Sequence, residues 1–294
     1  MSSTDTPSIE RKPADLGHDT AVHAVPKVPG LYRCRLPDHW NYISPCGGVL
    51  MTVALRAMKR ELGEDGLVLL SATTIFCQAL QPGDLDVEVL VLRRGDSAAQ
   101  VRASVRNAAQ PGPGLEVTAT FVREREGPDV HGIRMPDVPP PLEALEAANR
   151  RNAGSPTTLN IHHNWDFANA VGEPLGQPGW SAGPAHSGFW YRYRVSQCDS
   201  NGILDPLALP PIADTMPPAL TRRLGPTHER LLMPSLDLTV YFIAPAEGEW
   251  ILVESFAERA RAGSCVASAN LWDCRGQLVA RAAQTMTLRK RRRA

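Results

Sequence analysis

The chain has 294 residues, and its 31 lysines and arginines are balanced by 31 aspartates and glutamates, so its formal net charge is +0. A neutral chain exerts no long-range attraction on polyanions, which argues against a nucleic-acid partner. Hydrophobic residues make up 43% and charged residues 21%, as in globular proteins with one large or two ordinary domains. No apolar run reaches the ~20 residues of a membrane span, and the polar stretch 1–19 has no signal-peptide core. We expect a soluble, cytoplasmic protein with no membrane partner.

The cysteines are scattered without a C-x-x-C pair and without histidines at metal-binding spacing. We therefore expect reduced thiols and no metal site, although the even number also permits three disulfides. The six residues are Cys34, Cys46, Cys77, Cys198, Cys265 and Cys274.

Composition divides the chain into four parts. Residues 1–30 are rich in Pro, Ser, Thr and charge and lack periodicity, which predicts a mobile leader. Residues 127–185 begin with a Pro-rich stretch, contain one short candidate helix at 142–150 and continue as polar sequence, which predicts a linker. The linker would separate an N-terminal domain, 31–126, from a C-terminal domain with a basic tail, 186–294.

The N-terminal domain begins with a pattern typical of a buried helix at 44–62. Ser44 is the expected N-cap and Pro45 the first helical residue, and apolar residues occupy nearly every side. A helix that is apolar all round must be surrounded by other elements. Four β-rich segments follow, separated by turns with Gly and Pro, at 72–79, 85–92, 98–107 and 115–123.

The C-terminal domain has the same order of elements. A helical segment is predicted at 205–220, and four strands follow at 235–243, 250–259, 264–273 and 277–288. Pairing Ser71 with Ser235 gives an offset of 164 residues, and pairing Gly114 with Gly276 gives 162, so the register of the repeat holds to about two residues.

A unit of one helix and four antiparallel strands therefore occurs twice. A strongly bent sheet can wrap such a helix, and a second copy can cover the edge strand that the first leaves exposed. The sequence predicts an α+β fold of the double hotdog type, in which each of two tandem repeats wraps a long helix in a bent antiparallel sheet.

An aromatic strand at 189–195 precedes the second helical segment. Strand alternation puts Phe189, Tyr191 and Tyr193 on one face and Trp190, Arg192 and Arg194 on the other. We interpret the first face as core filling and the second as solvent-exposed.

Six motifs follow one another in a fixed order between residues 40 and 288. The first half contains Gly47-Gly48 at the helix start, FCQALQPGD at 76–84 and LRRGDSAAQVRASV at 92–105. The second half contains ADTMPPAL at 213–220, SLDLTVYF at 235–242 and LWDCRGQLVARAAQ at 271–284. Together they resemble the acyl-CoA thioesterase II family of double hotdog enzymes over nearly all of this range except the linker.

The resemblance implies a hydrolytic centre in which an Asp, a hydroxyl and a Gln hold the attacking water. These roles fall on Asp214, Ser235 and Gln284. Thr239 is an alternative hydroxyl, because strand parity would place it on the same face as Ser235. The first half has no acid at the position that matches Asp214, so one site per chain is expected.

Asp214 follows the largely apolar segment ILDPLALPPIAD. Partial desolvation there would raise the pKa of its carboxyl and make it a stronger base. Two proline pairs, 210–211 and 217–218, interrupt the second helical segment and confine Asp214 to a short helical turn.

Gly47 and Gly48 are the candidate oxyanion and substrate-binding residues. Backbone N–H groups at a helix N-terminus favour negative charge, and glycine permits close approach. Each candidate also has a structural interpretation. The glycines could serve packing alone, Asp214 could be a cap, Ser235 a strand start and Gln284 an outward strand residue.

The resemblance implies an acyl-CoA thioesterase that releases a free acid and coenzyme A without a metal or cofactor, in fatty acid metabolism. Its partner would be an acyl-CoA or an acyl-carrier thioester. A non-hydrolytic acyl-thioester binding protein, or a hotdog enzyme of a biosynthetic pathway, stays an alternative, because a fold alone does not set activity. A nucleophilic-serine hydrolase is disfavoured, since no G-x-S-x-G occurs. Association into homo-oligomers is open.

The run from Arg289 to Arg293 carries five basic residues. It reads as a solvated end or as a contact for the phosphates of coenzyme A or for an acidic carrier domain.

Overall fold

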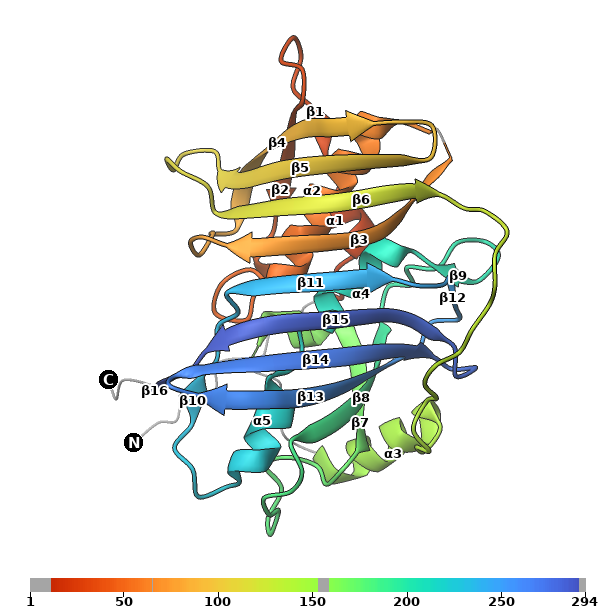
Figure 1. The fold of residues 1–294 in the computed structure, drawn as a ribbon. Coiled ribbons are helices and arrows are strands. Elements are labelled where there is room, and N and C mark those ends of the chain that lie inside the picture. Colours follow the sequence, from red (N-terminus) through yellow and green to blue (C-terminus); the bar gives the residue numbers. More distant parts are fainter. Residues whose placement is uncertain (1–11, 65, 153–158, 291–294) are drawn as a thin grey trace.

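The computed structural model describes residues 12–64, 66–152 and 159–290. Residues 1–11 of the expected leader and the last three arginines of the expected tail lie outside these ranges. One antiparallel sheet of 12 strands runs through the molecule, with α2, α4 and α5 on one face and α3 on the other (Figure 1). The strand order is β1-β2-β4-β5-β6-β3-β11-β15-β14-β13-β8-β7.

The N-terminal half of this sheet packs around one long helix, α2 (Gly47–Leu62), of whose 16 residues eleven are buried. This burial agrees with a helix that is apolar on nearly every side. The strands of this half are β1 (His23–Ala24), β2 (Leu31–Leu36), β3 (Leu67–Phe76), β4 (Gly83–Arg94), β5 (Ala98–Asn107) and β6 (Leu115–Arg123).

The start of α2 differs from the expectation. The N-cap is Cys46, with φ −57° and ψ 131°, and Ser44 and Pro45 lie before the helix. Pro45 forms an isolated β-bridge with Asn41, and the Cys46 amide donates to the Trp40 carbonyl at 3.0 Å. These bonds hold the segment before the helix in a closed loop, so the helix begins only at Gly47.

The C-terminal half repeats this arrangement with shorter helices. Its strands are β7 (Trp165–Val171), β8 (His186–Tyr193), β11 (Asp237–Phe242), β13 (Ile251–Arg261), β14 (Ser264–Asp273) and β15 (Leu278–Thr287). In place of one long helix it has η3 (Pro206–Ala208), α4 (Leu209–Ala213) and α5 (Pro217–Leu224). The proline pairs stand in the first turns of α4 and α5, and Asp214 lies between the two helices.

The halves join along β3 and β11, which pair antiparallel with Thr73 opposite Thr239. On either side of this seam the strand order is symmetrical, so each half covers the edge strand of the other. The predicted double hotdog fold is confirmed.

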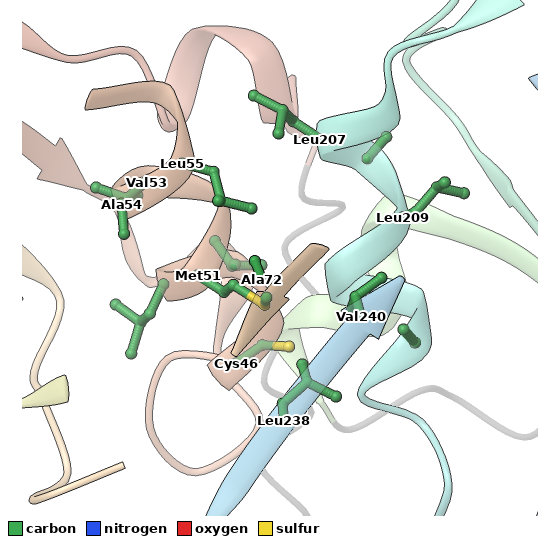
Figure 2. Close-up of a cluster of buried hydrophobic side chains, with 14 of the residues drawn as sticks. Cys46, Met51, Val53, Ala54, Leu55, Ala72, Leu207, Leu209, Leu238 and Val240 are labelled. Carbon is green, nitrogen blue, oxygen red and sulfur yellow. The ribbon is translucent and has the colours of Figure 1, made fainter. Parts of the chain in front are cut away.

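The helices of both halves meet behind the seam strands (Figure 2). Leu55 of α2, Leu209 of α4 and Val240 of β11 belong to one buried core at this place, and the Cys46 side chain points from the start of α2 toward α4. We call the sheet face that carries this core the inner face. The seam thus brings the N-terminus of α2 beside the C-terminus of α4.

Part of the expected leader is structured. It contains α1 (Leu16–Asp19) and β1, and Leu16 is fully buried. Asp19 accepts a hydrogen bond from the Trp40 indole N–H at 2.9 Å. A few buried contacts therefore hold this segment on the N-terminal half. They involve too few apolar residues to produce a periodic pattern in the sequence.

The expected linker also contributes to the fold. Within it, β7 pairs with β8 as an edge strand of the sheet, and α3 (Pro141–Asn152) lies on the outer face of the C-terminal half (Figure 1). Trp190, expected in solvent, is 2% exposed because α3 and the preceding proline segment cover it, and its indole N–H donates to the Pro139 carbonyl at 2.9 Å. Tyr191 and Tyr193 fill the inner core as expected.

Short elements complete the chain. They are η1 (Asp38–Trp40), η2 (Asn160–Asn164), and the two-stranded ribbons β9 (Ile203–Leu204) with β12 (Ala246–Glu247) and β10 (Leu231–Leu232) with β16 (Arg289–Lys290). No helix within the described ranges combines the length and the apolar character needed to cross a membrane.

Candidate active site

The site lies where the two halves meet, and its acid is Asp214, the residue that caps the end of α4. The Asp214 amide donates to the Pro210 carbonyl at 3.2 Å, which closes the last turn of this short helix. Its carboxylate crosses the seam, because Oδ2 accepts from the Gly48 amide of the N-terminal half at 3.2 Å. The proline pairs that bracket Asp214 thus place it opposite the first turn of α2.

Ser235 approaches the same carboxylate from the strand side. Its hydroxyl Oγ lies 3.1 Å from Asp214 Oδ1 and 3.5 Å from Gln284 Oε1, in donor geometry toward each. A hydroxyl has one proton, so the shorter contact to the charged group takes it and the Gln284 oxygen keeps a free lone pair.

Gln284 lies on β15 with its side chain on the inner face, and it is 1% exposed. Its amide nitrogen Nε2 is buried and has no hydrogen-bond partner in the described part of the chain. A buried donor without a partner costs about 1–3 kcal/mol, so such a group ordinarily has a water or a ligand to bind. The Gln284 amide therefore offers both a donor and an acceptor to a molecule in the site.

The alternative hydroxyl, Thr239, is on the opposite face, so the parity argument for it was wrong. Its Oγ1 lies 3.0 Å from Thr73 Oγ1 on the outer face of the seam. Ser235 is opposite Met286 and Thr239 is opposite Ala283, so four steps along one strand match three along the other. This extra residue turns Ser235 to the inner face, because one residue of slip exchanges the faces of a strand.

Burial controls the acidity of Asp214. Removal from water raises the pKa of its carboxyl from 3.8 to about 6, against hydrogen bonds from Ser235, Gly48, Cys46 and Gly47 that lower it. The group is thus ionised at neutral pH yet far more basic than an exposed aspartate. This is the property that a general base needs.

The two glycines allow the halves to approach this closely. A Cβ atom on Gly48 would lie 2.1 Å from the Pro210 carbonyl oxygen, and one on Gly47 would lie 2.5 Å from Phe76 Cζ and 2.9 Å from Asp214 Oδ2. Their amides belong to the first turn of α2, where N–H groups have no partner within the helix. In this structure the Gly48 amide donates to Asp214 Oδ2. The oxyanion role expected for this amide would therefore require that the hydrogen bond to Asp214 be released.

Two residues of the site were missed by the sequence interpretation. Cys46 Sγ lies 3.7 Å from Asp214 Oδ2 and 3.9 Å from the Pro211 carbonyl oxygen, and burial holds the pKa of its thiol well above the usual range. Phe76, at the end of β3, packs against Gly47. The signal for Cys46 was its position directly before the glycine pair, which an evaluation of the cysteines by metal spacing ignored.

All six cysteines are free thiols in the structure. Within the described ranges, no group of three or more His, Cys, Asp or Glu side chains is arranged to hold a metal ion.

Two family models together match most of the chain. The acyl-CoA thioesterase N-terminal domain matches residues 36–123, and the acyl-CoA thioesterase C-terminal domain matches residues 136–288. The fold is that of a double hotdog protein, and the two family models place the chain in the thioester hydrolase class. It belongs to the acyl-CoA thioesterase family.

Solved structures show the same fold at low sequence identity. A hot dog fold protein of unknown function from Alicyclobacillus acidocaldarius is 18% identical, with a TM-score of 0.78 and coverage of 94% of this chain and 98% of its own. Acyl-CoA thioesterase II TesB2 from Mycobacterium marinum is 20% identical, with a TM-score of 0.70 and coverage of 94% and 99%. The tesB protein of Mycobacterium avium subspecies paratuberculosis is 19% identical, with a TM-score of 0.70 and coverage of 93% and 97%. No functionally curated protein matches the chain significantly.

Proposed function

We propose that this protein hydrolyses acyl-CoA thioesters by direct attack of a water molecule held by Asp214, Ser235 and Gln284. One observation carries the proposal. A carboxylate with a raised pKa, a hydroxyl and an amide with unused hydrogen-bonding capacity converge across the seam, next to a helix N-terminus. These are the parts that water attack on a thioester requires.

In the proposed reaction, Asp214 takes a proton from the water while the water oxygen bonds to the thioester carbon. Gln284 accepts from or donates to the same water and fixes its direction, and Ser235 holds the carboxylate and the amide at a set spacing. The carbonyl oxygen gains the negative charge of a tetrahedral intermediate. The carbon–sulfur bond then breaks, and the proton on Asp214 passes to the leaving thiolate, which yields the acid and the free thiol.

The N-terminus of α2 has a second part in this scheme. The Gly48 amide donates to the ionised carboxylate before reaction. As Asp214 takes the proton it loses its charge, just when negative charge develops on the substrate oxygen. We propose that the amides of Gly47 and Gly48 then donate to that oxygen instead of to the carboxyl. The N-terminus of a helix favours a negatively charged group, and the charge has moved to the substrate oxygen.

The main alternative is a protein that binds the thioester without hydrolysing it. Such a protein would bind the thioester beside the same residues but would not need a base in the site. A covalent serine mechanism is disfavoured, because the Ser235 hydroxyl contacts a carboxylate and an amide and no hydrogen bond to a histidine is found for it in the described residues.

We further propose that the substrates are acyl-CoAs of cytoplasmic fatty acid metabolism and that no cofactor takes part. Figure 2 shows buried apolar side chains of α2, α4 and β11 beside Cys46, so the side of the site that faces the core is apolar. An acyl chain bound against this side would be removed from water while the thioester faces Asp214.

The test is release of thiol from a panel of acyl-CoAs by purified protein. Since exposed Cys77 and Cys274 would themselves react with a thiol dye, the assay uses a variant with Cys77→Ser and Cys274→Ser. Asp214→Asn should lower kcat by about 10²–10⁴-fold, as expected for loss of a general base. The matched control is Asp96→Asn, in the exposed turn between β4 and β5. Binding of acyl-CoA without thiol release in the parent protein would support the binding protein instead.

A further inference from the structure

One aromatic side chain lies at the carboxylate of the candidate active site. Phe76 is the last residue of β3, and its ring packs on the first residue of α2. A Cβ atom on Gly47 would lie 2.5 Å from Phe76 Cζ, 2.8 Å from Phe76 Cε1 and 2.9 Å from Asp214 Oδ2. The tip of the ring and the carboxylate oxygen are therefore neighbours, because both lie against the same glycine.

The residues of the site fall into two groups by exposure. Three are buried and form its inner side: Cys46, Gly48 and Gln284. Four are partly exposed and form its open side: Gly47, Phe76, Asp214 and Ser235. Along β3 the exposure of the inner face begins at Phe76, since Ala72 and Thr74 on the same face are buried. A molecule that approaches Asp214 from the open side therefore meets the Phe76 ring.

The position of this ring is fixed by its surroundings. The Phe76 amide donates across the seam to the Leu236 carbonyl at 2.9 Å. The next two amides, of Cys77 and Gln78, both donate to the Gly114 carbonyl, at 2.9 and 3.0 Å. The Phe76 side chain packs against the hydrophobic core. The ring thus fills the space over Gly47 and limits the room beside the carboxylate.

The proposed reaction places one of two groups against the ring. The thioester carbon lies next to the water at Asp214, and besides its oxygen it carries the sulfur and the first carbon of the acyl group. The sulfur leads to the nucleotide of coenzyme A, a charged group that favours solvent, whereas Phe76 belongs to the apolar side of the site. The first acyl carbon is therefore the group that suits the ring.

The ring discriminates between acyl groups by their shape at this carbon. A straight chain presents a slim CH₂ group there, whereas a branch adds a methyl group in the space that the ring occupies. Well-packed sites resist an added methyl group, because neighbouring side chains have to leave their preferred positions.

We propose that Phe76 is a specificity-determining residue that restricts the substrates to acyl groups without a branch at the carbon next to the thioester. This inference rests on the proposed function and names the substrate class of that site.

The test compares two isomers, butanoyl-CoA and 2-methylpropanoyl-CoA, which differ only in a branch next to the thioester. The parent protein should prefer butanoyl-CoA in kcat/KM by about 10- to 200-fold, the range that one methylene group commands in an enzyme site. Phe76→Ala should lower this preference by at least about tenfold, and Phe76→Leu, which retains an apolar side chain for packing, should give an intermediate value. Both substrates are measured on one preparation, so the ratio does not depend on the fraction of folded protein.

Phe256→Ala is the matched control. Phe256 is also partly exposed, but it stacks on His186 at the outer face of the sheet, with ring centroids 4.5 Å apart. This variant should retain the parental preference. Equal hydrolysis of both isomers by the parent protein, an unchanged preference in Phe76→Ala and Phe76→Leu, or the same change in Phe256→Ala would overturn the proposal.

Failure of the proposed function would be recognised separately. If the parent protein releases thiol from neither isomer, hydrolysis is refuted, and the dissociation constants of the two acyl-CoAs, measured by calorimetry, then test Phe76 alone. The parent protein should bind butanoyl-CoA more tightly than its isomer, and Phe76→Ala should reduce the difference. Equal dissociation constants in the parent protein would show that the ring does not select against the branch.

Discussion

Asp214 should lower the stability of the protein at neutral pH, and Asp214→Asn should restore it. The folded structure raises the pKa of this carboxyl from 3.8 to about 6, so the folded state holds the proton more tightly than the unfolded chain. The resulting stabilisation is complete below pH 3.8 and is lost as the pH rises through about 6. The whole effect is about 3 kcal/mol at 1.36 kcal/mol per pKa unit.

Between pH 5 and pH 8 the part that can be measured is about 1.4 kcal/mol, from the same two pKa values. Urea unfolding of both proteins at several pH values gives the free energy of unfolding. The advantage of Asp214→Asn over the parent protein should grow by this amount across the range, because asparagine does not titrate. Asp96→Asn, in an exposed turn, should show no such growth. A stability difference that stays constant from pH 5 to pH 8 would refute the reasoning.

Three further changes test the contacts of the site. Cys46→Ala removes a thiol that faces Asp214 Oδ2, so the acid limb of the kcat/KM profile should move above pH ~6, whereas Cys265→Ala, at a buried position on β14, should leave the profile in place. An unmoved limb in Cys46→Ala would show that the thiol does not act on the carboxyl. Gly48→Ala would put a Cβ atom 2.1 Å from the Pro210 carbonyl oxygen, so the free energy of unfolding should fall by about 1–3 kcal/mol in urea titrations, and a parental value would contradict the close packing. Gln284→Ala removes the amide that is free to hold water, and kcat should fall by about 10²–10³-fold with little change in KM, as measured by steady-state thiol release. A change in KM alone would assign this amide to substrate binding.

The fold could be predicted well wherever local pattern and repeat agreed. The strands at 98–107 and 115–123 have the predicted bounds, because buried residues alternate strictly along both. The repeat predicted that each half covers the other's edge, and the pairing of β3 with β11 agrees with it. The proline pairs predicted that Asp214 lies in a short helical turn between them, and in the structure Asp214 is the C-cap of the five-residue helix α4.

Features that depend on distant contacts could not be predicted. Nothing local to Trp190 indicates that α3, some forty residues earlier, covers it. The helix start at Gly47 depends on hydrogen bonds of the preceding loop, which offers a capping serine that the structure does not use. The face of Ser235 depends on one unmatched residue between two strands, and a regular alternation has no means of showing it.

The central claim is that water attacks the thioester directly while Asp214 acts as a base. A single turnover in H₂¹⁸O, with the enzyme in excess over the acyl-CoA, tests it. Direct attack predicts that the acid formed in this first turnover contains ¹⁸O and that the carboxyl of Asp214 contains none. An unlabelled acid, together with ¹⁸O in the peptide that carries Asp214, would show that the carboxylate itself attacked the thioester and would contradict the account.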